Sequence, residues 1–154
     1  MGKHNLLRTV GVLLISALAL SVVTQAVNAE LTSENVRTWY WTDDTIVESI
    51  ASGDVDGDGQ TEIVTGGYYD DGTRYVAQLC VWNGATLALE NVRTWYWTGG
   101  TRVYSVAVGN VDGDAQTEIV TGGHYSDGTR NVAQLCVWNG ATLTLENVKT
   151  LTML

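Results

Sequence analysis

The residues best suited to chemistry in this chain of 154 residues lie in two acidic loops. The first loop reads DVDGDGQTE from Asp54, and the second reads NVDGDAQTE from Asn110. Carboxylates at alternate loop positions can converge on one point when the backbone turns sharply, and their oxygens suit a hard cation. Calcium fits better than magnesium, because magnesium requires tight octahedral geometry and gives up its water reluctantly. The pattern predicts a calcium site in each loop.

Each loop offers the same kinds of oxygen ligand. The side chains at loop positions one, three and five come first, and they need further oxygens from a main-chain carbonyl, from the glutamate at position nine and from water. The first loop is not a complete EF-hand, because Thr65 holds the twelfth position and strands flank it. The candidate metal ligands are Asp54, Asp56, Asp58, Gln60 and Glu62 in the first loop, and Asn110, Asp112, Asp114, Gln116 and Glu118 in the second.

The loops belong to a longer internal repeat with an offset of 56 residues, so that Trp39 recurs as Trp95 and Cys80 as Cys136. A unit of this length suits a β-propeller blade better than a helical hairpin. Each copy contains four strand candidates separated by turn signals, which predicts an antiparallel meander. The strands are expected at 45–52, 62–69, 74–82 and 87–97, and the second copy repeats them from Thr101, Glu118, Arg130 and Leu143.

Turn residues and chain ends complete this picture. Asp71-Gly72 and Asn83-Gly84 predict tight hairpins, because these residues accept positive φ. The acidic loop joins the first strand to the second, and a bound cation would complete that hairpin. Further outer strands are expected at 31–41, before the first complete copy, and at 143–151, after the second. An unpaired outer strand would leave an edge prone to aggregation.

The two copies differ in charge, and the acidic composition argues against a nucleic-acid partner. The net charge is −9, and no basic patch of the kind that binds nucleic acid is visible. Residues 31–86 contain ten acidic and two basic side chains, whereas residues 87–142 contain five and three. The second loop has Asn110 at position one and Ala115 where glycine is expected. We therefore expect the second loop to bind calcium more weakly than the first.

The N-terminus predicts export. Lys3 and Arg8 precede an apolar run at 10–23, and Val27-Asn28-Ala29 offers small residues for cleavage, so residues 1–29 are interpreted as a signal peptide. A retained membrane anchor is the alternative, although the apolar run is short for a span. The mature chain would be secreted or held at the cell surface, without a membrane span. It would comprise residues 30–154, with one repeat at 31–86, a second at 87–142 and a partial third at 143–154.

The segment GDVDGDGQTEIVTGG resembles the FG-GAP and VCBS repeats of integrin-like propellers. The resemblance implies an all-β fold of β-propeller blades, with calcium in the loop between the first two strands of a blade. It assigns side-chain ligands to Asp54, Asp56 and Asp58, a carbonyl ligand to Gln60, and the ninth position to Glu62, where aspartate is usual. Two blades cannot close a ring, so the chain would be part of a longer array, an open stub or a homo-oligomer. Three chains would make a six-bladed ring.

The function that follows is a non-enzymatic, exported module, in which calcium is structural and an extracellular protein or polysaccharide is bound, as in adhesion. The binding role comes from the resemblance. An alternative is a propeller enzyme, or an enzyme accessory, that acts on extracellular polysaccharide. A third interpretation is a purely structural ring or stub without any ligand. No nucleophile with an orienting base, phosphate loop or zinc spacing is present in the sequence, so no catalytic or cofactor-binding residue is predicted.

The cysteine and aromatic residues each allow more than one interpretation. Cys80 and Cys136 hold equivalent places in neighbouring copies, which favours buried free thiols, with an intermolecular bridge as the alternative. The WYW triplets that begin at Trp39 and Trp95 are expected to pack between blades, and a stacking surface for sugar or peptide is their alternative. The tyrosines nearest to loops or strand ends are the candidates for ligand contact: Tyr68, Tyr69, Tyr104 and Tyr125.

Overall fold

The computed structural model describes residues 34–150. All the described strands belong to one compact unit, which begins at Asn35. The predicted signal peptide lies outside the described residues. Within the described part of the chain, no helix is long and apolar enough to cross a membrane.

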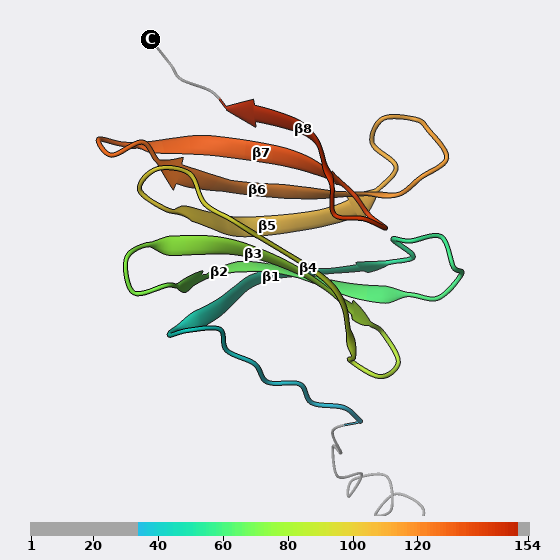
Figure 1. The fold of residues 1–154 in the computed structure, drawn as a ribbon. Coiled ribbons are helices and arrows are strands. Elements are labelled where there is room, and N and C mark those ends of the chain that lie inside the picture. The colour runs from blue at the N-terminus through green and yellow to red at the C-terminus, as the bar shows by residue number, and fades with distance from the viewer. Residues whose placement is uncertain (1–33, 151–154) are drawn as a thin grey trace, which may run out of the picture. The chain divides into compact units, whose positions relative to one another are not determined.

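The described residues form two four-stranded antiparallel sheets, which confirms the all-β prediction (Figure 1). Each sheet is a meander in which the strands pair in chain order, as the hairpin signals predict. Both sheets are open, as expected for blades of an incomplete ring. The first sheet contains β1 (Thr45–Gly53), β2 (Glu62–Asp70), β3 (Tyr75–Asn83) and β4 (Leu89–Trp95), and the second contains β5 (Thr101–Gly109), β6 (Glu118–Ser126), β7 (Asn131–Asn139) and β8 (Leu145–Thr150).

The core lies between the two sheets, where β5 packs against β1, β2 and β3 (Figure 1). Leu79 is fully buried on the first sheet, and Val103 and Val106 are buried on the second. Gly66 provides the space for this contact, because a Cβ atom there would lie 2.3 Å from Cγ2 of Val106. Apolar burial of this kind is the main favourable contribution to the free energy of folding. The sheets therefore stabilise each other.

A register shift marks the first hairpin of both sheets. It lies between Val47 and Ser49 in the β1–β2 pair, and between Val103 and Ser105 in the β5–β6 pair. A bulge of this kind bends its strand and increases the local twist. In the first sheet the bend also serves the contact with the second, because the Ser49 Oγ atom accepts a hydrogen bond of 3.0 Å from the Val106 N–H.

Tryptophans pack on the sheet that follows them in the chain. The ring centroid of Trp95, at the end of β4, lies 4.6 Å from that of Trp138, and its Nε1 donates to Gln134 Oε1 at 3.2 Å. Trp39 lies in the same way on Trp82, with the centroids 4.5 Å apart. The Trp95 contact confirms the expected packing between blades for the second triplet. Trp39 packs on the first sheet with no described blade before it, and the tyrosines of the two triplets, Tyr40 and Tyr96, are 79% and 51% exposed.

The prediction of a strand at 31–41 is wrong for residues 35–41, whereas β8 confirms most of the strand expected at 143–151. Residues 35–41 pair with no described strand: their equivalent, β4, pairs with β3 of its own repeat, and the described residues contain no corresponding strand before residue 35. Side chains hold them on the first sheet instead: Trp41 Nε1 donates to Gln78 Oε1 at 2.7 Å, and Asn35 Nδ2 donates to the Ala85 carbonyl at 3.0 Å. We call residues 35–41 the strap.

Both cysteines are buried free thiols, as the repeat predicts. Burial raises the pKa of the Cys80 thiol and that of the Cys136 thiol to about 11. Both thiols are therefore protonated at neutral pH, and they act as small apolar residues rather than as nucleophiles.

The two hairpin turns of the first sheet differ from each other. Gly72 has φ of 87°, which confirms the expected turn between β2 and β3. The turn between β3 and β4 departs from prediction, because its residue with positive φ is Leu87, at 56°, and not Gly84. Gly84 is required for space instead: a Cβ atom there would lie 2.1 Å from the Thr61 carbonyl oxygen.

Candidate metal centre

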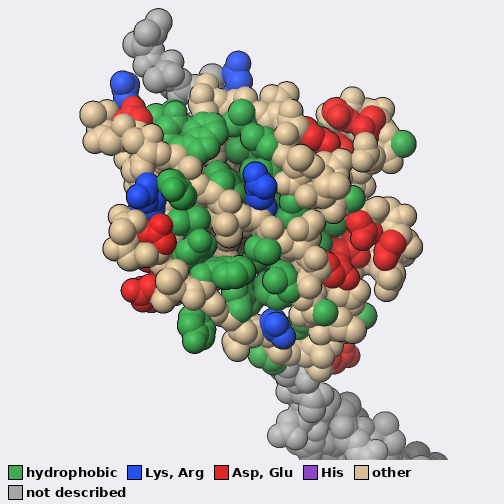
Figure 2. All heavy atoms as spheres, viewed as in Figure 1, with side chains coloured by type: hydrophobic (Ala, Val, Ile, Leu, Met, Phe, Trp, Pro, Cys, Tyr) green, Lys and Arg blue, Asp and Glu red, His purple; other side chains and the backbone are tan. Residues whose placement is uncertain are grey.

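The acidic loops occupy equivalent places in the two sheets. The first joins β1 to β2 and the second joins β5 to β6, as predicted. Figure 2 shows that acidic side chains gather at the end of the molecule where both loops lie. This end of the described structure therefore attracts cations.

The first loop is held in shape by its own carboxylates. Asp54 Oδ1 accepts a hydrogen bond from the Gly57 N–H at 2.7 Å, and Asp54 Oδ2 accepts one from the Gly59 N–H at 3.0 Å. Gly57 and Gly59 have φ of 84° and 86°, a region that glycine adopts without strain. The two glycines thus let the loop curl around the Asp54 side chain.

This curl brings three carboxylates together. Asp54, Asp56 and Asp58 each offer an oxygen, and these oxygens lie within 4.8 Å of one another. Like charges at such distances repel each other, so the arrangement favours a cation among them. All three are hard oxygen donors of the type that calcium takes. The donor set therefore fits calcium.

Glu62 closes the base of the first loop from within the protein. Its side chain is buried, and Oε2 accepts a hydrogen bond from the Val55 N–H at 2.8 Å. Burial raises the pKa of Glu62, and the charges of Asp56 and Asp58 raise it further. A divalent cation in the loop would oppose this shift, because it favours the charged carboxylate.

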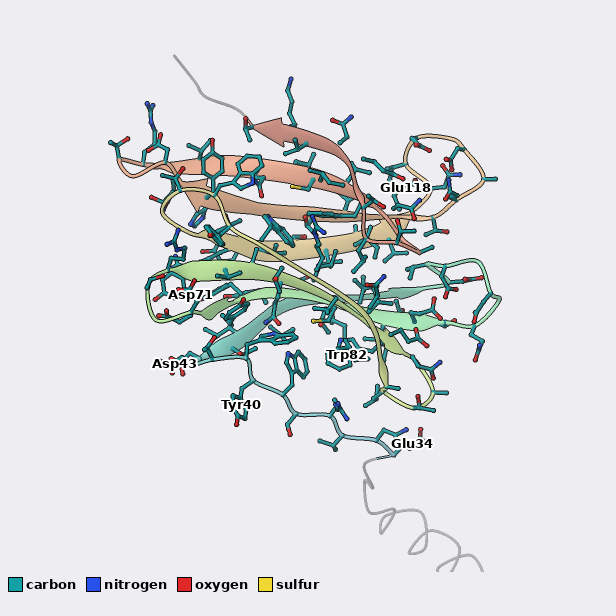
Figure 3. All side chains as sticks on the ribbon, in the orientation of Figure 1. Glu34, Tyr40, Asp43, Asp71, Trp82 and Glu118 are labelled. Atoms are coloured by element: carbon teal, nitrogen blue, oxygen red, sulfur yellow. The ribbon has the colours of Figure 1, made fainter. Side chains whose placement is uncertain are left out.

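The second loop gathers a different trio, Asp112, Asp114 and Glu118, whose oxygens also lie within 4.8 Å of one another. Glu118 is fully buried at the start of β6, at the base of the loop (Figure 3). Its Oε2 accepts from the Val111 N–H at 2.8 Å, while Oε1 is buried without a hydrogen-bond partner among the described residues. A buried carboxylate oxygen without a donor is unfavourable, and a cation would satisfy it.

The second loop differs from the first at Asn110 and Ala115. Asn110 Oδ1 accepts from the Gly113 N–H at 2.7 Å, but its Nδ2 is a donor and bonds to the Asp114 carbonyl. The bond between Gly59 and Asp54 in the first loop has no equivalent here, because an amide nitrogen cannot accept it. Ala115 also avoids the positive φ of Gly59. Ala115 therefore carries no strain of the left-handed region, and the second loop differs in conformation from the first at this position.

The two glutamine side chains support the loops without entering either cluster. Gln60 Nε2 donates to Asp58 Oδ2 at 2.8 Å, and Gln116 Nε2 donates to Asp114 Oδ2 at 3.2 Å. Gln116 Oε1 also accepts from Asn139 Nδ2 at 2.9 Å, which joins the second loop to the end of β7. Each glutamine side chain thus orients one carboxylate of its loop.

An aromatic cluster lies on another part of the surface, around Arg102. The guanidinium carbon of Arg102 lies 3.8 Å from the ring centroid of Tyr75 and 5.1 Å from that of Tyr68. Tyr104 joins the cluster, with centroids 6.4 Å from Tyr68 and 5.3 Å from His124. Burial lowers the pKa of His124, and the charge of Arg102 lowers it further, which favours neutral imidazole. We call these five residues the tyrosine cluster.

The sequence identified part of this cluster. Tyr68 and Tyr104 come together as candidates for ligand contact, whereas Tyr69 and Tyr125 pack on Trp41 and Trp97. Arg102 and its contact with Tyr75 were not predicted from the sequence. The repeat gave no signal for Arg102, because Ile46 holds the equivalent position in the first copy.

Comparison with known proteins bears on the first loop. Residues 47–77 match the FG-GAP repeat. The FG-GAP match covers most of β1, the first acidic loop, the whole of β2 and the start of β3. No curated protein and no solved structure matches the chain. The FG-GAP repeat suggests an integrin-like β-propeller module, a binding or structural unit, in agreement with two sheets built as blades.

Proposed function

We propose that each acidic loop binds one calcium ion, and that the chain is an exported, non-catalytic module that binds an extracellular protein or polysaccharide. The observation that supports calcium most strongly is the recurrence of a three-carboxylate cluster at the same link of both sheets. The buried, unpartnered Glu118 Oε1 supports it independently. The FG-GAP match supports the propeller-type module.

Calcium, when bound, supplies positive charge where the side chains leave a negative excess. Asp54, Asp56 and Asp58 would hold the ion of the first loop, and Asp112, Asp114 and Glu118 would hold the ion of the second. The ion would fix the link between the first two strands of each sheet. Its role is therefore structural, and it suits an extracellular setting, where modules of this class bind calcium with dissociation constants of about 0.1 to 1 mM.

A calcium titration should reveal two unequal sites, with the tighter one in the first loop. The first loop has a charged aspartate at position one, whereas Asn110 has its amide nitrogen turned to the Asp114 carbonyl. Isothermal titration calorimetry would measure both affinities. We expect a difference of about tenfold, equivalent to about 1.4 kcal/mol of binding free energy.

The matched control is the double substitution Asn110→Asp with Ala115→Gly, which gives the second loop the sequence of the first. This variant should bind calcium at two sites of nearly equal affinity. A second site that stays weak would show that the difference arises outside the loop. Two equal sites in the unsubstituted chain would contradict the proposed order of affinity.

The tyrosine cluster is the surface that we propose for ligand contact, because aromatic faces and a cation suit the rings of a polysaccharide. Tyr104 is its most accessible tyrosine, with an exposed fraction of 42%. Tyr104→Ala should weaken binding to an array of extracellular polysaccharides by about fivefold, because one stacking contact contributes about 1 kcal/mol. The control is Tyr96→Ala, which removes an exposed ring outside the cluster. Equal loss in both variants would contradict this assignment, and breakdown of a bound polysaccharide would favour an enzyme instead.

A further inference from the structure

Each sheet packs one face against the other sheet and leaves its opposite face free. The residues on each free face are the repeat equivalents of the residues buried between the sheets. Leu79 is 0% exposed between the sheets, whereas its equivalent Leu135, on the free face of the second sheet, is 50% exposed. Val106 is 8% exposed between the sheets, whereas its equivalent Ile50, on the free face of the first sheet, is 67% exposed. The free faces therefore carry the two halves of the contact that the chain already makes once.

The acidic loops show the same difference between a filled and an open contact. Val55 in the first loop is 2% exposed, and it lies against the second sheet, where a Cβ atom on Gly140 would be 2.2 Å from the Val55 carbonyl oxygen. Its equivalent in the second loop, Val111, is 55% exposed. The socket equivalent to the Gly140 region is an open pocket of about 440 Å³ on the first sheet. Its lining residues are Gln60, Thr61, Ile63, Asn83, Gly84 and Ala85.

One cation–π contact within the chain also has an equivalent pair of residues that do not contact each other. The Arg74 guanidinium carbon lies 4.5 Å from the ring centroid of Tyr96, in the segment that joins β4 of the first sheet to β5 of the second. The equivalent pair is Arg130 on the second sheet and Tyr40 before the first. Tyr40 is 79% exposed, and Figure 3 shows its ring pointing away from the sheets. A cation on one free face therefore has its matching ring on the other.

We propose that these faces join copies of this chain head to tail: the face of the second sheet with Val111, Leu135 and Arg130 docks on the face of the first sheet with Ile50 and Tyr40. The contact continues the interface within the chain by one more repeat. A second copy is the occupant because it carries both halves, whereas an unrelated partner would have to reproduce one of them. A contact between unlike faces forms a ring if the rotation closes and an open filament if it does not.

At such a contact between two copies, the strap of one copy and β8 of the other would compete for the same place on the first sheet. The strap lies on the first sheet where β4 lies on the second, since Asn35 Nδ2 bonds to the Ala85 carbonyl as Asn91 Nδ2 bonds to the Ala141 carbonyl. An incoming β8 would need that same place. The strap already supplies Trp39 to Trp82, as β4 supplies Trp95 to Trp138. The incoming β8 is therefore the strand that gives way.

The test uses two variants of the full chain, purified in calcium, each with one face blocked. Leu135→Asp blocks the second-sheet face, and Ile50→Asp blocks the first-sheet face. The unsubstituted chain should associate as its concentration rises in sedimentation equilibrium. Each variant alone should remain a monomer of 16.6 kDa, because a buried unpaired carboxylate should raise the dissociation constant by at least about 30-fold. An equimolar mixture should form a dimer of twice that mass, since each variant retains the face that the other lacks.

Val92→Asp is the matched control, because it places the same charge on an exposed apolar residue outside the contact. Its equivalent in the second sheet, Val148, remains 36% exposed beside the contact between the sheets. This variant should associate like the parent. A second, milder variant, Arg130→Ala, should raise the dissociation constant by about three- to fivefold through loss of one cation–π contact. A parent chain that stays monomeric, or a mixture of blocked variants that does not dimerise, would overturn the proposal.

Discussion

Asp56→Asn should make the chain less stable than the parent in calcium and more stable than the parent in chelator. The asparagine keeps an oxygen that can accept from the Asp58 N–H, a bond of 3.1 Å in the parent, so the loop retains its shape. It removes one of three clustered charges, which weakens calcium binding and relieves repulsion when calcium is absent. At about 10 mM calcium, roughly 100 times a dissociation constant of about 0.1 mM, a site contributes about 2.7 kcal/mol to stability. The variant should lose most of that contribution.

Urea unfolding in calcium and in chelator would measure the four free energies that this prediction compares. Asp43→Asn is the charge-matched control, because Asp43 is an exposed acid outside the loops. It should change the stability by the same small amount under both conditions. A variant Asp56→Asn that keeps the calcium-dependent gain of the parent would remove Asp56 from the site. Equal stability of parent and variant in chelator would show that the clustered charges do not repel measurably.

The strands of both sheets could be predicted to within two residues at each end, because local signals agree with one another. Positions such as Glu62 and Thr101 begin a strand in both prediction and structure. Each copy carries the same turn residues, so an assignment in one copy is repeated in the other. The acidic loops were found for the same reason: alternate carboxylates with glycine are a local pattern, and they lie where the first hairpin of each sheet turns.

The features that could not be predicted from the sequence depend on contacts between residues far apart in the chain. The strap has the sequence of an outer strand, but a strand needs a partner strand, and the strap pairs with none of the described strands. Leu87 takes the positive φ of its turn because Gly84 is needed beside the Thr61 carbonyl, a packing requirement that no turn rule contains. The unpartnered Glu118 Oε1 likewise follows from burial, and burial is a property of the folded chain.

Gly67→Ala should lower the free energy of unfolding by about 3 kcal/mol, because it forces a side chain into the backbone of the neighbouring strand. A Cβ atom at Gly67 would lie 1.9 Å from the Ile46 carbonyl oxygen and 3.1 Å from the Val47 Cα atom. The register shift after Val47 brings the backbone of β1 this close to β2. The obstacle is backbone and cannot turn aside as a flexible side chain could, so β1 and β2 must separate. Thermal unfolding followed by circular dichroism would measure the loss.

Gly109→Ala provides the control for this substitution, since a Cβ atom there would meet nothing within 4 Å and its φ is not positive. It should leave stability unchanged or raise it by about 0.4 to 1 kcal/mol, because alanine reduces the entropy of the unfolded chain. Gly123→Ala, the equivalent of Gly67 in the second sheet, should behave like Gly67→Ala, as its Cβ atom would lie 2.0 Å from the Arg102 carbonyl oxygen. If Gly67→Ala costs no more stability than Gly109→Ala, the backbone of β1 does not approach Gly67 as closely as described. The close approach, and with it the position of the strand that enters the first acidic loop, would then be wrong.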